Sequence, residues 1–295
     1  MFNLPLDNQN LTETTSINLL KQIRCEEILT PLSSDPILTT YVTEGRGETP
    51  ILLLHGFDSS LLEFRRLFPL LAKHHPTWAV DLLGFGFTQR MTGLSFSPRD
   101  IKTHLYYFWK TLIQKPMILV GASMGGATAI DFSLTYPDMV KKLILIDSAG
   151  LAKPPTIGKF MFPPLDYLST AFLRNSWVRQ QISRVAYYDK SLASKDAQVC
   201  AALHLQCPRW SEALITFTKS GGYGCFTEYL SNLKIPTIII WGENDKILGT
   251  KDATKFQELI PDNELIWIAK CGHVPHLEQP EITADNVIQS ISPNK

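Results

Sequence analysis

The residue that most clearly indicates catalysis is a serine with one glycine two positions before it and another two positions after it. Ser123 lies in the run Gly-Ala-Ser-Met-Gly at 121–125, directly after the apolar run 117–120 and before a segment, 124–136, with helical composition. A sharp strand-to-helix turn of this G-x-S-x-G pattern would strain the serine backbone and expose its hydroxyl. The helix N-terminus would also offer the free N–H of Met124 to a developing oxyanion. Ser123 is therefore the predicted nucleophile.

A serine hydroxyl needs a base to take its proton and a carboxylate to orient that base. His273 follows the apolar run 265–268, and Asp245 follows the apolar run 237–240. Because ligands of open α/β sheets bind outside the carboxyl ends of the strands, loops far apart in sequence would converge there. We predict His273 as the general base and Asp245 as the acid that orients it.

Other residues compete for these roles. Asp147 follows the run 143–146 and is the main rival for the acid, although Asp245 is preferred. His276 is a weaker candidate for the base than His273. His55 is interpreted as a scaffold residue, and Cys271, which has no base of its own, as a packed thiol.

Bulk properties narrow the class of function. The 295 residues include 28 Lys plus Arg and 28 Asp plus Glu, so no summed positive field favours nucleic acid. The five cysteines have no C-x-x-C spacing, which argues against a disulfide framework and a zinc site. The N-terminal stretch lacks the pattern of a secretory signal, and no run approaches the roughly 18 apolar residues of a membrane span. We expect a cytoplasmic protein acting on a small hydrophobic substrate; a homo-oligomer stays open.

Apolar runs alternate with helical patterns in the order typical of a mostly parallel sheet covered by helices. Predicted strands cover 51–54, 117–120, 142–146, 236–241 and 264–268, and predicted helices cover 60–73, 124–136 and 279–290. Ser60 and Glu63 fit a capping box at the start of the first helix. The alternation stops between about 150 and 232, a stretch rich in aromatic residues and proline that we interpret as a helical cap.

The order Ser123, Asp245, His273 resembles that of the α/β-hydrolase fold family, over about residues 25–290. His-Gly-Phe-Asp at 55–58 is similar to the family's oxyanion loop, and 81–86 to its D-x-x-G-x-G turn. The resemblance implies an α/β-hydrolase fold, with a mostly parallel eight-stranded sheet flanked by helices and an inserted helical cap. It also implies that the backbone N–H of Phe57 is the second oxyanion donor beside Met124.

The domain boundaries that follow place an N-terminal extension at 1–24, the core at 25–149 and 232–295, and the cap at 150–231.

This constellation predicts acyl transfer through an acyl-enzyme, with a hydrophobic carboxylic ester as substrate and neither cofactor nor metal. An alternative is hydrolysis of a carbon-carbon bond in a 2-hydroxy-6-oxo-dienoate, since 123–129 resembles the meta-cleavage-product hydrolases and Arg209-Trp210 their lid pair. Val274, where those enzymes have Trp, and the His-Gly-Phe run at 55–57 depart from their pattern. A cofactor-free perhydrolase and a hydrolase-fold ligand receptor are further alternatives. The run 55–66 also looks like hydrolases of plastids and photosynthetic bacteria, which suggests a lipid-like ester.

Overall fold

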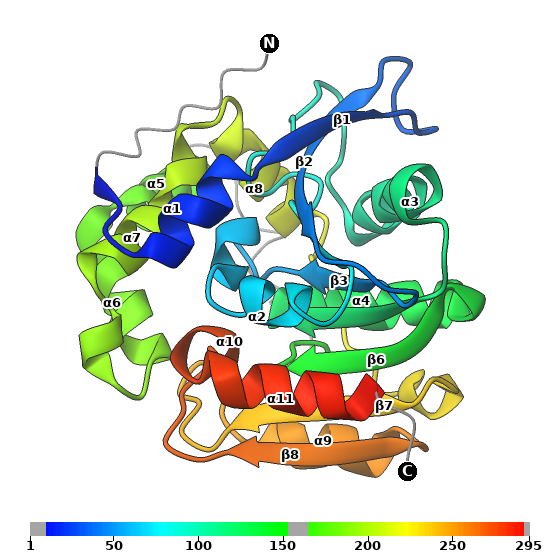
Figure 1. Ribbon diagram of the computed structural model, residues 1–295. Coiled ribbons are helices and arrows are strands. Elements are labelled where there is room, and N and C mark those ends of the chain that lie inside the picture. Colours follow the sequence, from blue (N-terminus) through cyan, green and yellow to red (C-terminus); the bar gives the residue numbers. More distant parts are fainter. Residues whose placement is uncertain (1–9, 153–164, 292–295) are drawn as a thin grey trace.

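One mixed sheet organises the molecule (Figure 1). The computed structural model describes residues 10–152 and 165–291. The strands are β1 (Arg24–Ile28), β2 (Ile37–Glu44), β3 (Ile51–Leu54), β4 (Thr77–Val80), β5 (Met117–Ala122), β6 (Val140–Ile146), β7 (Thr237–Gly242) and β8 (Asn263–Ile268). They lie in the order β1-β2-β4-β3-β5-β6-β7-β8. The pairs β1/β2 and β2/β4 are antiparallel, and all the other pairs are parallel. The predicted fold class, a mostly parallel eight-stranded sheet, is confirmed.

The central strands are apolar along their whole length because helices cover both faces of the sheet. Every residue of β3, β5 and β7 is buried. Alternate residues of β3 enter different core clusters: Leu52 and Leu54 pack with Phe132, whereas Ile51 and Leu53 pack with the other cluster. Because successive side chains of a strand point to opposite faces of the sheet, β3 contributes side chains to both clusters.

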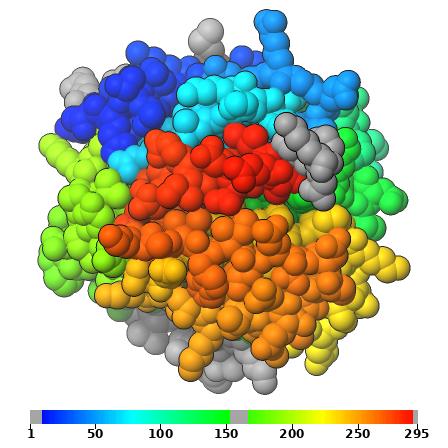
Figure 2. Space-filling view, turned by 60° about the horizontal axis from the view of Figure 1, so that its bottom comes forward, coloured from blue at the N-terminus to red at the C-terminus, as the bar shows by residue number. Residues whose placement is uncertain are grey.

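Helices complete three layers. The helices are α1 (Thr14–Lys21), α2 (Phe68–Ala72), α3 (Pro98–Phe108), α4 (Met124–Thr135), α5 (Leu165–Arg174), α6 (Ser176–Ala186), α7 (Lys195–Ala202), α8 (Trp210–Lys219), α9 (Lys251–Leu259), α10 (Pro275–Glu278) and α11 (Pro280–Ile291). Core residues of α3, α4 and α9 belong to one cluster, and those of α1, α2 and α11 to the other. In Figure 2, α11 (red) lies beside the cyan segment that contains α2, in agreement with the contacts between these helices.

The segment between β6 and β7 carries α5, α6, α7 and α8, with no strand among its described residues. Figure 1 shows α5, α6 and α7 gathered at one end of the sheet. We call α5, α6, α7 and α8, with the 3-10 helices between them, the cap helices, since they lie within the range 150–231 in which the sequence predicts a helical cap. None of the helices in the described part of the chain is long and apolar enough to cross a membrane.

The N-terminal helix α1 is built into both the core and the cap helices. Leu19 and Leu20 are buried in the core. The carboxylate of Asp196, in α7, accepts hydrogen bonds from the Thr12 N–H (2.6 Å), the Glu13 N–H (2.8 Å) and the Ser16 hydroxyl (2.5 Å). The described part of the predicted N-terminal extension is thus packed against the rest of the molecule.

The predicted helix over 60–73 is wrong in one respect, because the chain there forms two short helices. A 3-10 helix, η2 (Leu61–Phe64), is followed by α2, which has Pro69 in its first turn. Proline has no N–H to continue a preceding helix. Ser60 caps η2 by accepting from the Leu62 N–H at 3.4 Å, but the Glu63 carboxylate accepts from the Gly56 N–H at 3.1 Å instead of closing a capping box.

Candidate active site

Ser123 lies at a strained turn between β5 and α4. Its backbone has φ 52° and ψ −119°, a conformation that costs a non-glycine residue about 1–2 kcal/mol. The Ser123 N–H donates to the Ile146 carbonyl at 3.0 Å, and the Ser123 carbonyl accepts from the Ala149 N–H at 2.9 Å. A Cβ at Gly121 would lie 2.2 Å from the Gly125 carbonyl oxygen. The turn therefore requires a glycine before the serine and fixes the serine backbone from both sides.

His273 and Asp245 form a buried hydrogen-bonded pair. The distance between His273 Nδ1 and Asp245 Oδ2 is 2.9 Å. The other carboxylate oxygen of Asp245 accepts from the Ile247 and Leu248 N–H groups at 2.7 and 3.1 Å. Burial alone would raise the pKa of Asp245, but the hydrogen bond from His273 and these N–H groups lower it. The carboxylate is thus ionised where it meets the imidazole.

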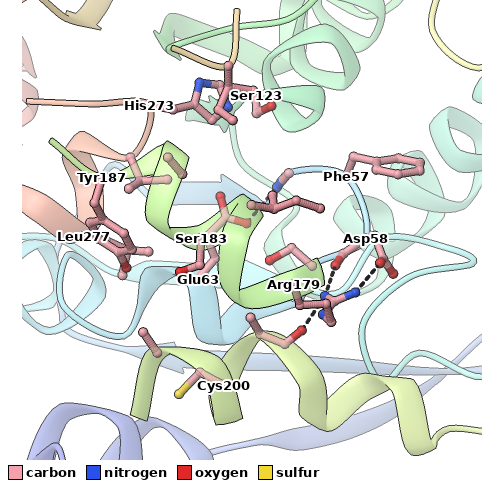
Figure 3. A pocket seen from close by; sticks show the side chains of 18 of the residues that line it. Phe57, Asp58, Glu63, Ser123, Arg179, Ser183, Tyr187, Cys200, His273 and Leu277 are labelled. Atoms are coloured by element: carbon pink, nitrogen blue, oxygen red, sulfur yellow. Dashed lines mark hydrogen bonds and ion pairs between the residues drawn. The ribbon is translucent and has the colours of Figure 1, made fainter. Parts of the chain in front are cut away.

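Ser123 and His273 line the same cavity, and Figure 3 shows both side chains at one end of it. The two loops that follow β7 and β8 therefore meet the turn after β5, as the strand positions predict. Because Nδ1 of His273 is bonded to Asp245, Nε2 is the nitrogen left for a proton from another group.

Asp147, the rival acid, lies at the end of β6 beside this pair. Its carboxylate accepts from the Gly242 N–H at 3.2 Å, and its side chain is fully buried. Burial and the nearby charge of Asp245 raise the pKa of Asp147 well above its usual value. Its surroundings thus favour the neutral form of the Asp147 carboxyl and the ionised form of Asp245, and the carboxylate hydrogen-bonded to His273 Nδ1 is that of Asp245.

One polar atom from each of Asp147, Asp245 and His273 lies within 4.8 Å of the other two, a spacing that would also suit a metal ion. A hydrogen-bonded imidazole, an ionised acid and a protonated acid account for the same spacing, since a shared proton removes the repulsion between the two carboxyls. This chemistry fits a proton-transfer site better than a metal site.

Phe57 and Met124 supply the two predicted oxyanion donors. Phe57 follows β3 and lines the cavity, and Met124 is the first residue of α4. Among the described residues, no hydrogen bond uses the backbone N–H of either residue. Both N–H groups are therefore available to a ligand.

The loop before Phe57 is held by a histidine and a glutamate. His55 Nε2 accepts from the Leu82 N–H at 3.1 Å, so its Nδ1 carries the proton and donates to the Gly56 carbonyl at 2.8 Å. The Gly56 N–H is bound by Glu63, whose other oxygen lies 3.1 Å from His276 Nε2. These contacts fit the scaffold role predicted for His55, and His276 contacts Glu63.

The cavity has a volume of about 320 Å³ and extends from Ser123 to Cys200 of α7 (Figure 3). Much of its wall is apolar. It includes Leu173, Ile182, Ala186, Ala197, Val274 and Leu277.

Arg209 does not line this cavity. Its guanidinium donates to Glu212, to the Arg90 carbonyl and to the Thr92 hydroxyl. Cys271 is fully buried, and burial raises its pKa, as expected of a packed thiol.

Two carboxylates near the site had no predicted role. Glu278 accepts from the N–H groups of Gly272 (2.7 Å), Tyr188 (3.0 Å) and Asp189 (2.6 Å), and so ties the loop before His273 to the end of α6. Asp58, next to Phe57, binds three cap side chains. The sequence marks Asp58 only as part of the oxyanion-loop run, and nothing in it marks Glu278.

We predict that the stabilising effect of Glu63 is lost in acid. Burial would raise the pKa of Glu63, but the adjacent His276 lowers it to about 2, against about 4.3 in an unfolded chain. The carboxylate then stabilises the fold above about pH 4, and this contribution disappears as the pH falls towards 2. In urea unfolding, the free-energy difference between wild type and Glu63→Gln should be largest at pH 6 and shrink below about pH 4. Glu258→Gln, at an exposed residue, is the control and should show almost no difference. A difference for Glu63→Gln that is independent of pH would contradict the prediction.

Most of the chain is similar in sequence to known proteins. A sequence profile described as the alpha/beta hydrolase fold matches residues 49–280. The chain is 34% identical over 236 residues to the alpha/beta hydrolase domain-containing protein VTE7 of Arabidopsis thaliana, which covers 79% of this chain and 71% of the relative. It is 28% identical over 260 residues to a 2-hydroxy-6-oxo-6-(2'-aminophenyl)hexa-2,4-dienoic acid hydrolase of Metapseudomonas resinovorans, covering 86% and 87% of the two chains.

Solved structures agree with the fold. A thermophilic esterase from Thermogutta terrifontis superposes with a TM-score of 0.77 at 21% identity, covering 91% of this chain and 98% of the esterase. The profile match spans most of the chain, and the observed sheet order and strand directions accord with it. The protein belongs to the α/β-hydrolase fold family.

Proposed function

We propose that this protein is a serine hydrolase that acts through an acyl-enzyme on a carboxylic ester with a hydrophobic group. Ser123 is the nucleophile, His273 the general base, Asp245 the acid that orients it, and the N–H groups of Phe57 and Met124 form the oxyanion hole. The observation that carries the proposal is the hydrogen bond between Asp245 and His273, with His273 lining the same cavity as the strained Ser123.

The reaction follows from these positions. Ser123 Oγ attacks the ester carbonyl carbon while its proton passes to Nε2 of His273, and the carbonyl oxygen becomes an oxyanion bound by the two N–H groups. The C–O bond to the alcohol then breaks, and His273 returns the proton to the leaving oxygen. His273 then takes a proton from water, whose oxygen attacks the acyl carbon. The bond from that carbon to Ser123 Oγ breaks, the acid leaves, and His273 returns the proton to Ser123 Oγ.

The wall of the cavity supports a hydrophobic substrate group. Each of its two arginines lies close to acidic side chains: Arg179 Nη1 donates to Asp58 at 2.6 Å, and Arg65 Nε lies 3.7 Å from Glu13 and 3.9 Å from Asp196. Their charges are therefore balanced within the protein. A neutral, apolar group fits such a wall better than a carboxylate does.

Carbon-carbon hydrolysis of a dienoate is the second candidate, because one relative is named for that reaction. Arg209 is the residue that would hold the substrate carboxylate in this alternative, but it lies outside the cavity lining and is bonded to Glu212. These contacts favour the ester.

Paired substitutions distinguish the proposed role of Asp245 from that of Asp147. We expect Asp245→Asn to lower the rate of ester hydrolysis by about 10⁴, because an amide cannot hold the required histidine tautomer. Asp147→Asn should stay within about tenfold, since the raised pKa of Asp147 favours a neutral carboxyl, which the amide resembles, and a group outside the triad does not share its cooperative effect. His273→Ala should be as severe as Asp245→Asn, and His276→Ala should stay within about tenfold. Steady-state kinetics on p-nitrophenyl butyrate measures all four, and a larger loss in Asp147→Asn than in Asp245→Asn would move the acid to β6.

Chain-length preference tests the substrate class. Each methylene that the apolar wall buries should contribute about 0.8 kcal/mol, or nearly fourfold in kcat/KM, while the chain still fits. We therefore expect p-nitrophenyl butyrate or hexanoate to be a better substrate than the acetate, and Arg209→Ala to leave this activity largely unchanged.

Efficient cleavage of a 2-hydroxy-6-oxo-dienoate that collapses in Arg209→Ala would establish the alternative. Turnover that stops near one equivalent of p-nitrophenol would instead indicate a ligand receptor.

A further inference from the structure

The carboxylate of Asp58 is the point where the oxyanion loop meets the cap helices. Asp58 Oδ1 accepts from the Trp210 indole N–H at 2.8 Å and lies 3.1 Å from His204 Nε2. Asp58 Oδ2 accepts from Arg179 Nη1 at 2.6 Å. These three partners come from α8, from the 3-10 helix η7 (Leu203–Gln206) and from α6. One side chain therefore connects three cap elements to the loop after β3, and Figure 3 shows its contacts with Arg179.

Arg179 extends this connection to the neighbouring helices. Its Nη2 donates to the carbonyls of Ala201 (2.6 Å) and Asp58 (3.2 Å), and its Nη1 also donates to the Leu173 carbonyl at 3.3 Å. Leu173 lies in α5 and Ala201 in α7. The guanidinium thus binds both the carboxylate and the backbone of Asp58 while it joins the cap helices to one another.

The charge at Asp58 is stable at neutral pH. The side chain is 7% exposed, and its burial would raise its pKa. The hydrogen bond from His204 and the positive charge of Arg179 outweigh that effect and lower the pKa to about 2. An ionised, buried carboxylate that accepts several donors makes some of the strongest hydrogen bonds in a protein.

The backbone at Phe57 and Asp58 depends on these contacts. On one side the Gly56 N–H is bound by Glu63, and on the other the Ser59 carbonyl accepts from the Gly86 N–H at 3.0 Å. Of the two residues between these points, Phe57 and Asp58, only Asp58 makes hydrogen bonds within the described part of the chain, through its carboxylate and its carbonyl. Asp58 also has φ 47°, a left-handed conformation that a non-glycine residue keeps only where its surroundings hold it.

We propose that Asp58 is a positioning residue for the oxyanion hole, acting through the backbone of Phe57. Its contacts with Arg179, His204 and Trp210 fix the turn at 57–58, so that the Phe57 N–H faces the carbonyl oxygen of a substrate bound at Ser123. The inference rests on the proposed function, because it assigns the orientation of one of its two oxyanion donors. It also gives the cap helices a role in the reaction itself, in addition to enclosing the substrate.

A second buried carboxylate provides the matched control. Asp196, in α7, also accepts several hydrogen bonds, but its donors are Thr12, Glu13 and Ser16 in the N-terminal segment and Cys200 in its own helix. Asp196 is 1% exposed and does not line the cavity. Its loss should weaken the attachment of α7 without moving the oxyanion loop.

The test compares Asp58→Asn with Asp196→Asn in two measurements. One is the steady-state hydrolysis of p-nitrophenyl butyrate. The other is inhibition by a trifluoromethyl ketone, because the serine hydroxyl adds to its carbonyl carbon and the resulting oxyanion occupies the oxyanion hole. We expect Asp58→Asn to lower kcat by about 100-fold, the size of losing one oxyanion donor, with KM changed less than about threefold. The inhibition constant of the ketone should rise by a similar factor. Asp196→Asn should keep kcat within about threefold of wild type, even where its melting temperature falls as much as that of Asp58→Asn.

Trp210→Phe keeps the inference testable if Asp58→Asn fails to fold. It removes one donor to Asp58 and retains an aromatic ring, so we expect a smaller loss of kcat, about three- to tenfold, again with KM little changed. Equal kinetic effects of Asp58→Asn and Asp196→Asn, or a Trp210→Phe enzyme with unchanged kcat and ketone affinity, would overturn the inference. Full ester turnover by Ser123→Ala would instead overturn the proposed function, independently of what the Asp58 variants show.

Discussion

The backbone of Ser123 is the constraint on which the remainder of the site depends. Its positive φ reverses the chain between a fully buried strand and a buried helix, and this reversal works only because the neighbouring chains approach very closely. A Cβ at Gly125 would lie 2.0 Å from the Leu54 carbonyl oxygen, so α4 sits almost directly against the end of β3. The same approach brings the loop that begins at His55 next to Ser123. One strained turn therefore fixes the position of the proposed nucleophile and its distance to the proposed oxyanion loop.

Around this turn, buried carboxylates organise the loops that meet at the carboxyl ends of the strands. Asp81 accepts from the Leu61 and Phe87 N–H groups at 2.7 and 3.0 Å, Glu63 binds the Gly56 N–H, and Glu278 binds the Gly272 N–H. Loops lack the regular ladder that satisfies backbone N–H groups in helices and strands, and carboxylates supply the missing acceptors. Asp58 is also a buried acceptor, but its carboxylate binds side chains of the cap helices instead of backbone N–H groups of the core. Arg179 of α6 binds Asp58 and so attaches the loop of Phe57 to that helix. The His273 N–H donates to the Ala186 carbonyl at 2.7 Å and attaches the loop of His273 to the same helix.

The sequence predicts the features that depend on local pattern. Apolar runs locate β3, β5, β6, β7 and β8, and the residues just past three of them, Ser123, Asp245 and His273, lie where the strand ends predict. The roles of these residues stay predictions until they are tested. The strands β1, β2 and β4 are not predicted: β1 is half-exposed and has no apolar run, β2 contains three threonines, and β4 has only four residues. Asp58 and Glu278 could not be recognised, since their partners are about 90 to 150 residues away in the chain. Only the fold brings those residues together.

Reaction with a fluorophosphonate tests the central claim most directly. Ser123 Oγ should attack the phosphorus, with loss of fluoride, and leave a stable phosphonyl ester that peptide mapping by mass spectrometry can locate. The account predicts one phosphonyl group per chain, on Ser123, with loss of ester turnover in proportion to labelling and no such label in Ser123→Ala. Labelling of a different residue, or ester turnover that persists after Ser123 is fully labelled, would contradict it.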